Sequence, residues 1–104
     1  MAVHVTDATF EEEIKVGKTL VDFWAPWCGP CRMLGPVIEE LSQEFEGKIK
    51  IAKLNVDENP ITASRFGVMS IPTMIYFEDG KPIEQIVGFY PKPVLKEYLE
   101  SKLK

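Results

Sequence analysis

Two cysteines, Cys28 and Cys31, are the residues of this sequence whose types and spacing most clearly suit chemistry. They are the only cysteines among 104 residues, and only Gly29 and Pro30 separate them. Thiols at this spacing can close into a small disulfide ring and open again, so the pair can carry two electrons. An apolar run precedes the pair and a helical pattern follows it, which predicts a dithiol on a strand-to-helix turn. In a cytosolic protein, that arrangement suggests redox chemistry.

Two structural roles for the cysteine pair are weaker alternatives. A structural zinc site usually uses four nitrogen or sulfur ligands, but the sequence offers only these two cysteines and one histidine, His4. We assign His4 no catalytic role. A purely structural disulfide that closes so short a loop would add only about 2 kcal/mol to stability in the loop-entropy treatment. A redox role is therefore favoured over both alternatives, and we expect no bound metal.

The position of each cysteine relative to the helix predicts its role. Cys28 lies just before or at the helix start, where unpaired N–H groups and the helix dipole favour an anion. We therefore expect Cys28 to be exposed, to have the lower pKa and to attack as the thiolate. Cys31 falls in the first turn and points inward, so it should stay a shielded thiol and act second, as the resolving cysteine. Gly29 and Pro30 shape the turn, because proline fits the first helical position at little cost.

An aspartate within an otherwise apolar strand is the second candidate for chemistry. Asp22 interrupts the apolar run 20–25. A carboxylate is costly to bury unless it is paired or neutral, so we favour a buried carboxyl with a raised pKa over an exposed aspartate on an edge strand. Its expected role is to exchange a proton with Cys31, directly or through water. Lys53 interrupts the run 49–56 and could either approach Asp22 or be solvated at a strand end.

The elements that must position these groups follow from apolar periodicity and turn signals. A first helix is capped by Thr6 or Asp7 and ended by Gly17, and Pro36 should kink the second helix. Strands are expected at 3–5, 20–25, 49–56, 73–78 and 81–87, with further helices at 32–45, from 57–60 to Gly67, and at 91–103. The order βαβαβαββα predicts an α/β fold, a mixed five-stranded sheet flanked by four helices, in a single domain over residues 1–104.

Composition narrows the classes of partner. The net charge of −4 gives no electrostatic reason to expect binding to nucleic acid or to an anionic membrane. No apolar stretch approaches the ~20 residues of a membrane-spanning helix. The first residues lack a basic segment followed by an apolar one, so no secretory signal is visible and we expect a cytoplasmic protein.

Several separated motifs are similar to those of one known family. The sequence Trp24-Ala25-Pro26-Trp27-Cys28-Gly29-Pro30-Cys31 resembles the thioredoxin family, and its Gly-Pro dipeptide differs from the Gly-His dipeptide of protein disulfide isomerases. Further motifs that agree in order and spacing are Val21-Asp22-Phe23, Pro36, Lys53-Leu54-Asn55-Val56-Asp57, Phe66-Gly67-Val68, Ser70-Ile71-Pro72-Thr73 and Gly88. The resemblance covers essentially the whole chain and implies the thioredoxin fold.

The resemblance also implies features that the residues alone do not predict. About 5–6% of X–Pro bonds in folded proteins are cis, so the plain expectation for Ile71–Pro72 is trans, whereas the family implies cis. The Ile71 backbone should pair with a bound client segment. The family further places Lys53 near Asp22 and surrounds Cys28 with an apolar docking surface. That surface would consist of Trp27, Gly67, Val68, Met69, Ile71, Pro72 and Gly88.

The activity that the resemblance implies is general protein-disulfide reduction, a thiol–disulfide oxidoreductase reaction. Thioredoxin reductase would recharge the Cys28–Cys31 pair, so no cofactor is bound and NADPH is used only indirectly. Implied clients include peroxiredoxins, ribonucleotide reductase and methionine sulfoxide reductases, and the chain should be a monomer. The segment 89–93, Phe-Tyr-Pro-Lys-Pro, is bulkier than is usual for the family and could alter the choice of partner.

Two other functions stay open at this point. The same fold can serve an oxidant or isomerase, which a measured reduction potential would distinguish from a reductase. Alternatively, the apolar face could bind a partner without any electron transfer. A protein in which both cysteines are replaced by serine would keep its role only in that case.

Overall fold

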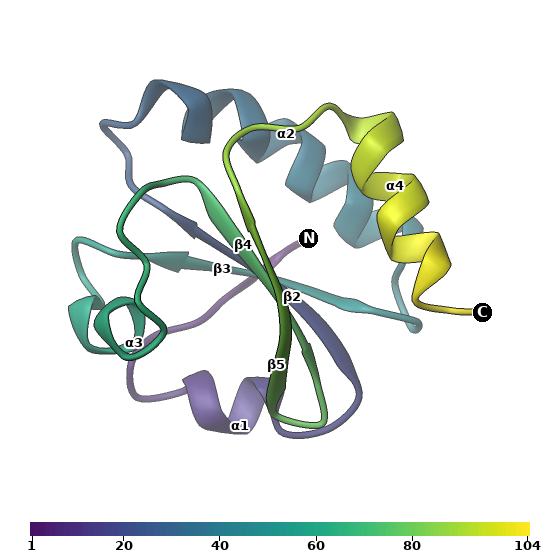
Figure 1. Ribbon diagram of the computed structural model, residues 1–104, viewed down its shortest axis with the longest axis horizontal. Helices are drawn as coiled ribbons and strands as arrows, with labels where there is room; N and C mark the ends of the chain where they lie inside the picture. Colours follow the sequence, from purple (N-terminus) through teal and green to yellow (C-terminus); the bar gives the residue numbers. More distant parts are fainter.

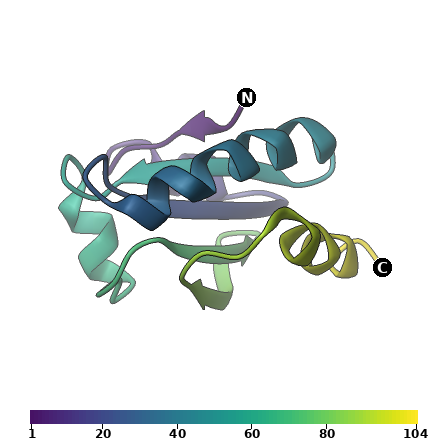
Figure 2. The same cartoon turned by 90° about the horizontal axis from the view of Figure 1, so that it is seen from above.

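A β-sheet lies between two layers of helices in the computed structural model, which describes residues 1–104 (Figure 1). Helices α2 and α4 cover one face of the sheet, and α1 and α3 cover the other (Figures 1 and 2). The strands are β1 (Val3–His4), β2 (Lys18–Trp24), β3 (Lys50–Asn55), β4 (Thr73–Glu78) and β5 (Lys81–Val87). The helices are α1 (Phe10–Ile14), α2 (Gly29–Glu44), α3 (Pro60–Arg65) and α4 (Lys92–Ser101). This is the mixed five-stranded α/β fold that the sequence predicts.

Strand β2 runs through the centre of the sheet. The strand order is β1-β3-β2-β4-β5, with β1, β3 and β2 parallel and with β4 and β5 antiparallel to their neighbours. Parallel strands need helical crossovers, which cover both faces, and a strand buried on both faces carries apolar residues almost throughout. Residues 19–23 of β2 are all buried accordingly. Any polar residue in β2 is therefore held away from water.

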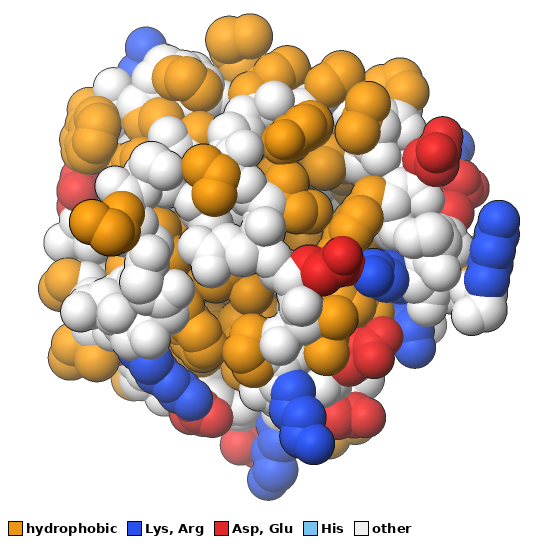
Figure 3. Space-filling view, in the orientation of Figure 1, with side chains coloured by type: hydrophobic (Ala, Val, Ile, Leu, Met, Phe, Trp, Pro, Cys, Tyr) orange, Lys and Arg blue, Asp and Glu red, His pale blue; other side chains and the backbone are white.

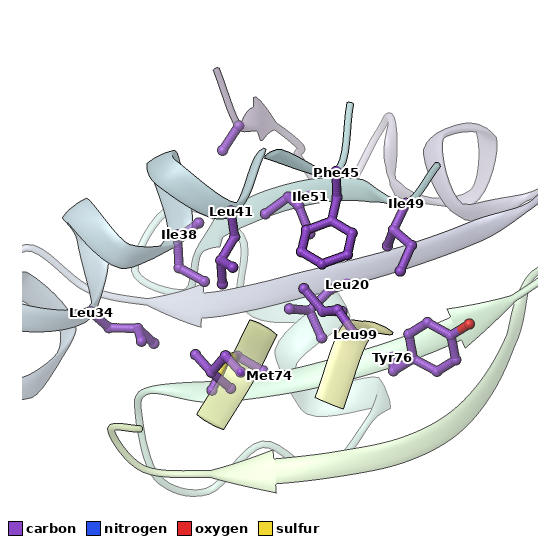
Figure 4. Packing of buried hydrophobic residues seen from close by; sticks show 12 residues of the cluster. Leu20, Leu34, Ile38, Leu41, Phe45, Ile49, Ile51, Met74, Tyr76 and Leu99 are labelled. Carbon is purple, nitrogen blue, oxygen red and sulfur yellow. The ribbon is translucent and has the colours of Figure 1, made fainter. Parts of the chain in front are cut away.

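Residues of alternate parity along β2 pack on opposite faces of the sheet. Leu20 points toward α2 and α4, where its neighbours form a buried cluster (Figure 4). That cluster contains Ala2, Leu20, Leu34, Ile38, Leu41, Phe45, Ile49, Ile51, Met74, Tyr76, Leu95 and Leu99. Val21 and Phe23 pack on the other face, against Phe10 and Ile14 of α1. Because side chains alternate along a strand, Asp22 shares the face of Leu20, beneath α2.

The capping prediction for Asp7 is wrong in detail. Thr9 directly precedes α1 but makes no side-chain cap bond to the helix. The Thr6 hydroxyl, the other predicted cap, accepts a hydrogen bond from the Thr9 backbone N–H, and the Thr9 hydroxyl accepts one from the Thr6 backbone N–H. The Asp7 carboxylate instead accepts hydrogen bonds from the backbone N–H groups of Ile61 and Thr62 at the start of α3. Asp7 thus accepts hydrogen bonds from otherwise unpaired N–H groups at the start of a helix that lies more than 50 residues further along the chain.

None of the four helices combines the length and the apolar character that crossing a membrane requires. Helix α2 is the longest, with 16 residues, and it continues through Pro36. Its start, at the end of β2, is where the two cysteines lie.

Candidate active site

The two cysteines lie where β2 turns into α2. Strand β2 ends at Trp24, Cys28 is the N-cap residue of α2 with extended backbone angles, and Pro30 occupies the first helical turn. Cys28 and Cys31 are joined by a disulfide, with their Cα atoms 5.2 Å apart. The pair therefore lies just beyond the carboxyl end of the central strand β2, and the start of α2 fixes its geometry.

The sulfur of Cys28 takes the place of a conventional capping oxygen. The backbone N–H of Cys31 donates a hydrogen bond to the Cys28 Sγ atom over 3.2 Å. Helix N-termini present unpaired N–H groups and the positive end of the helix dipole. In the reduced protein the same donor can stabilise a thiolate at Cys28, and the Cys31 sulfur, one turn into the helix, is not placed to receive it.

The expectation that Cys28 is exposed is wrong for this oxidised form. Cys28 is 5% exposed and Cys31 is 3% exposed, so burial does not distinguish the two sulfurs. They share a small cluster with Ala25, against which Trp24, Val56 and Ile71 pack. The difference between them lies in the cap geometry rather than in access to water.

A second segment approaches the disulfide from the start of β4. The carbonyl oxygen of Ile71 lies 3.6 Å from the Cys28 Sγ atom, and the Ile71–Pro72 peptide bond is cis, the isomer that the resemblance implies. The backbone N–H of Gly88 donates to the Pro72 carbonyl oxygen over 2.8 Å, which ties the end of β5 to the same place. The Ile71–Pro72 segment thus links the end of β5 to the neighbourhood of Cys28.

The residues expected to form the docking surface differ widely in exposure. Trp27 is 67% exposed and Met69 is 95% exposed, whereas Val68, Ile71 and Gly88 are half-buried and Pro72 is buried. Gly67 is exposed. In Figure 3 apolar side chains gather over the start of α2 and the α3–β4 connection, and most charged side chains lie along the lower and right-hand edges.

The indole of Trp27 is held by a residue to which the sequence assigned no role. Its Nε1–H donates a hydrogen bond to the Asp57 carboxylate over 2.8 Å. Asp57 ends the motif 53–57 that carries part of the family resemblance, and this is the signal that could have pointed to it. The bond fixes an exposed aromatic ring beside the disulfide.

Asp22 is buried without a hydrogen-bond partner. The residue is 1% exposed, and neither carboxylate oxygen is hydrogen-bonded. Burial raises the pKa of Asp22 from 3.8 to about 7, and the positive charge of Lys53 opposes that rise. The buried carboxyl favoured from the sequence is therefore the arrangement found, and both of its protonation states are populated near neutral pH.

Lys53 faces the same side of the sheet as Asp22. The two residues are register partners on adjacent parallel strands. The Lys53 side chain is only 14% exposed, so it is not a solvated strand-end lysine. No group of three or more His, Cys, Asp and Glu side chains is arranged to hold a metal ion, and His4 is exposed on β1.

Comparison with known proteins extends the likeness over nearly the whole chain. A family model described as Thioredoxin matches residues 1–101. Curated proteins named Thioredoxin from Staphylococcus saprophyticus and Staphylococcus aureus are 56% identical to the chain, and one from Staphylococcus haemolyticus is 57% identical. Each match spans 101 residues, 97% of this chain and 97% of the relative.

The burial of Asp22 predicts a stability that falls as pH rises. The pKa of Asp22 is about 7 in the folded protein, above the ordinary value of 3.8. The contribution of this carboxyl to folding stability is therefore fully present below pH 3.8 and is lost as pH rises through about 7. Asp22→Asn should remove this loss. The unfolding free energy of Asp22→Asn relative to that of the parent should therefore increase by on the order of 4 kcal/mol between pH 4 and pH 8.

Urea unfolding of the oxidised proteins across that pH range measures the difference. Glu58→Gln, a change at an exposed acid, serves as the control. Its unfolding free energy should change with pH in the same way as that of the parent. A constant difference between Asp22→Asn and the parent at all pH values would contradict a raised pKa.

Proposed function

The chain belongs to the thioredoxin family and is a protein-disulfide reductase, and from that premise we propose the role of each residue at the site. Cys28 is the nucleophile, Cys31 is the resolving cysteine and Asp22 exchanges a proton with Cys31. The observation that carries the assignment is the Cys28 sulfur at the N-terminus of α2, where the Cys31 N–H reaches it. Gly29 and Pro30 shape the turn that puts it there.

The first step is attack by Cys28 on the client. The Cys28 thiolate displaces one sulfur of the client disulfide, so one S–S bond breaks and a mixed disulfide forms. The displaced client sulfur leaves as a thiolate and takes up a proton from water. The hydrogen bond from the Cys31 N–H lowers the cost of carrying negative charge on Cys28 before the attack.

The second step releases the reduced client. Cys31 gives its proton to the Asp22 carboxylate and attacks the Cys28 sulfur, which breaks the mixed disulfide and frees the second client thiolate. The client has then gained two electrons, and the protein holds the Cys28–Cys31 disulfide. A carboxyl with a pKa of about 7 suits this transfer, because it can accept and return a proton near neutral pH. Lys53 moderates that pKa.

We propose that an extended client segment binds beside Ile71. No hydrogen bond within the protein uses the backbone N–H of Ile71, and its carbonyl oxygen faces the Cys28 sulfur. An extended peptide can pair with this free N–H as an added strand does. Trp27, Gly67, Val68, Met69, Pro72 and Gly88 would supply the surrounding surface. The exposed aromatic residues Phe89 and Tyr90 follow Gly88 directly and would influence the choice of client.

The remaining assignments follow from the reaction and the family. A dithiol that acts catalytically must be reduced again, so we assign thioredoxin reductase as the electron donor, with NADPH used only through it. Peroxiredoxins, ribonucleotide reductase and methionine sulfoxide reductases fit as disulfide-bearing clients. The cytoplasm is the proposed location, because a reducing compartment keeps such a dithiol active. We also propose that residues 1–104 act as one domain and as a monomer.

Exchange of each cysteine for serine tests the two roles in the reaction. Cys31→Ser should attack clients and then stall, so mixed disulfides should accumulate, whereas Cys28→Ser should form none. Both variants should lose insulin-disulfide reduction with dithiothreitol as the electron donor. The complexes are counted on non-reducing gels. Mixed disulfides that form with Cys28→Ser and not with Cys31→Ser would reverse the assignment.

Removal of the Trp27 side chain tests the docking surface. Because Trp27 is mostly exposed, Trp27→Ala should change the melting temperature little while raising KM for insulin reduction at least about fivefold, the effect of losing 1 kcal/mol or more at a contact anchor. Val16→Ala, which shortens another mostly exposed apolar side chain away from the disulfide, is the matched control. An unchanged KM would remove Trp27 from the client-binding surface.

A further inference from the structure

Lys53 lies between two carboxylates, and only one of them is part of the site described above. We propose that Glu39 is a positioning residue, which holds the Lys53 ammonium and thereby sets the charge state of Asp22. Only the consequence of this coupling for the reaction rests on the proton-exchange role that we propose for Asp22. The electrostatic coupling itself can be measured without it.

The contacts of Lys53 place its ammonium away from direct pairing with Asp22. The Lys53 Nζ atom lies 3.9 Å from the Glu39 Oε2 atom and 4.8 Å above the centroid of the Trp24 ring. Neither oxygen of Asp22 has a hydrogen-bond partner, although Lys53 is its register partner on β3. Glu39 and Trp24 therefore draw the ammonium to one side, and Asp22 receives its charge only from a distance.

Both oxygens of the Glu39 carboxylate are engaged. The backbone N–H of Ala2 donates a hydrogen bond to Oε1 over 2.9 Å, while Oε2 faces Lys53. Ala2 is buried and leads directly into β1, and the N–H of Val5 donates to the Lys53 carbonyl oxygen over 2.9 Å. The segment at the start of β1 thus contacts both the Glu39 carboxylate and the backbone of Lys53, which places that carboxylate beside Lys53.

The other titratable groups on this face are exposed or already paired. His4 of β1, the register partner of Lys53, is exposed, and Lys102 and Glu84 form an ion pair beside Tyr76. The β4 residue in register with Asp22 is Met74, which is uncharged. On α2 the titratable groups near the site are Glu39 and Cys31, and Cys31 is held in the disulfide. On α4, Lys92 and Lys96 are paired with Glu40 and Glu44 of α2. Glu39 and Lys53 are therefore the pair through which the protein can adjust Asp22.

The sign of the effect is unambiguous. A negative charge at Glu39 repels a negative charge on Asp22, and it also attracts the Lys53 ammonium that would stabilise that charge. Both effects favour the protonated form of Asp22. Loss of the Glu39 charge must therefore make Asp22 ionise at lower pH.

The test follows the Asp22 carboxyl carbon by NMR as pH is varied, in the oxidised protein, where neither cysteine titrates. Glu39→Gln keeps an oxygen for the Ala2 N–H and removes the charge, so the Asp22 midpoint should fall by at least about half a pH unit. Glu40→Gln is the matched control, because it removes the same charge from the next residue of α2, which pairs with Lys92 instead. Its midpoint should stay within about 0.2 pH unit of the parent.

Two further variants test the route through Lys53. Glu39→Asp keeps the negative charge, so its Asp22 midpoint should lie close to that of the parent. This variant also keeps the proposal testable if Glu39→Gln folds poorly. In a Lys53→Met background, Glu39→Gln should shift the midpoint by less than half as much. A Glu39→Gln midpoint that is unchanged or raised would overturn the proposal, as would a shift equal to that of Glu40→Gln or one undiminished without Lys53.

The rate of mixed-disulfide resolution separates this inference from the proposed role of Asp22. If Asp22 serves Cys31, the midpoint of the rate against pH should move with the NMR midpoint in Glu39→Gln. If the NMR midpoint moves and the rate profile does not, Glu39 still positions Lys53, and the proton-exchange role assigned to Asp22 is wrong.

Discussion

The hydrogen bond from the Cys31 backbone N–H to the Cys28 sulfur is the interaction on which the account depends. It makes one of two neighbouring cysteines the N-cap of a helix and the other a residue of that helix. Burial does not separate the two sulfurs, since both are almost inaccessible in the disulfide. What separates them is the field at the end of α2. Strand β2 places this helix start, and the Ile71 segment packs against it.

A second constraint comes from the charge that the protein buries beside this helix. An unpaired carboxyl within the central strand destabilises the fold whenever it ionises, yet Asp22 is kept where its pKa is about 7. Such a cost at an otherwise well-packed site is typical of groups retained for chemistry. The charge of Lys53 limits this cost, but Lys53 makes no hydrogen bond to the Asp22 carboxyl.

Local patterns in the sequence predict the elements well where the determinants are local. Strands β4 and β5 match their predicted bounds, because Asp79 and Gly80 both adopt positive φ in the turn that joins them. Apolar spacing likewise predicts most of α2. The errors arise where distant residues decide. Asp7 serves a helix beyond residue 59, and neither apolar spacing nor turn signals reveal such a contact. The partner of Lys53 on α2 and the covering of Cys28 by Ile71 are hidden for the same reason. The cis bond contradicts base rates, and only the family resemblance implied it.

Ionisation of the two thiols in the reduced protein tests the central claim most directly. The measurement is the rate of alkylation of each cysteine as a function of pH, with the two sites resolved by mass spectrometry. Cys31→Ser gives the reference profile for Cys28, and Cys28→Ser gives that for Cys31. We expect Cys28 to react as a thiolate at distinctly lower pH than Cys31. Equal ionisation of the two, at the pH typical of an unperturbed thiol of about 8.5, would contradict it.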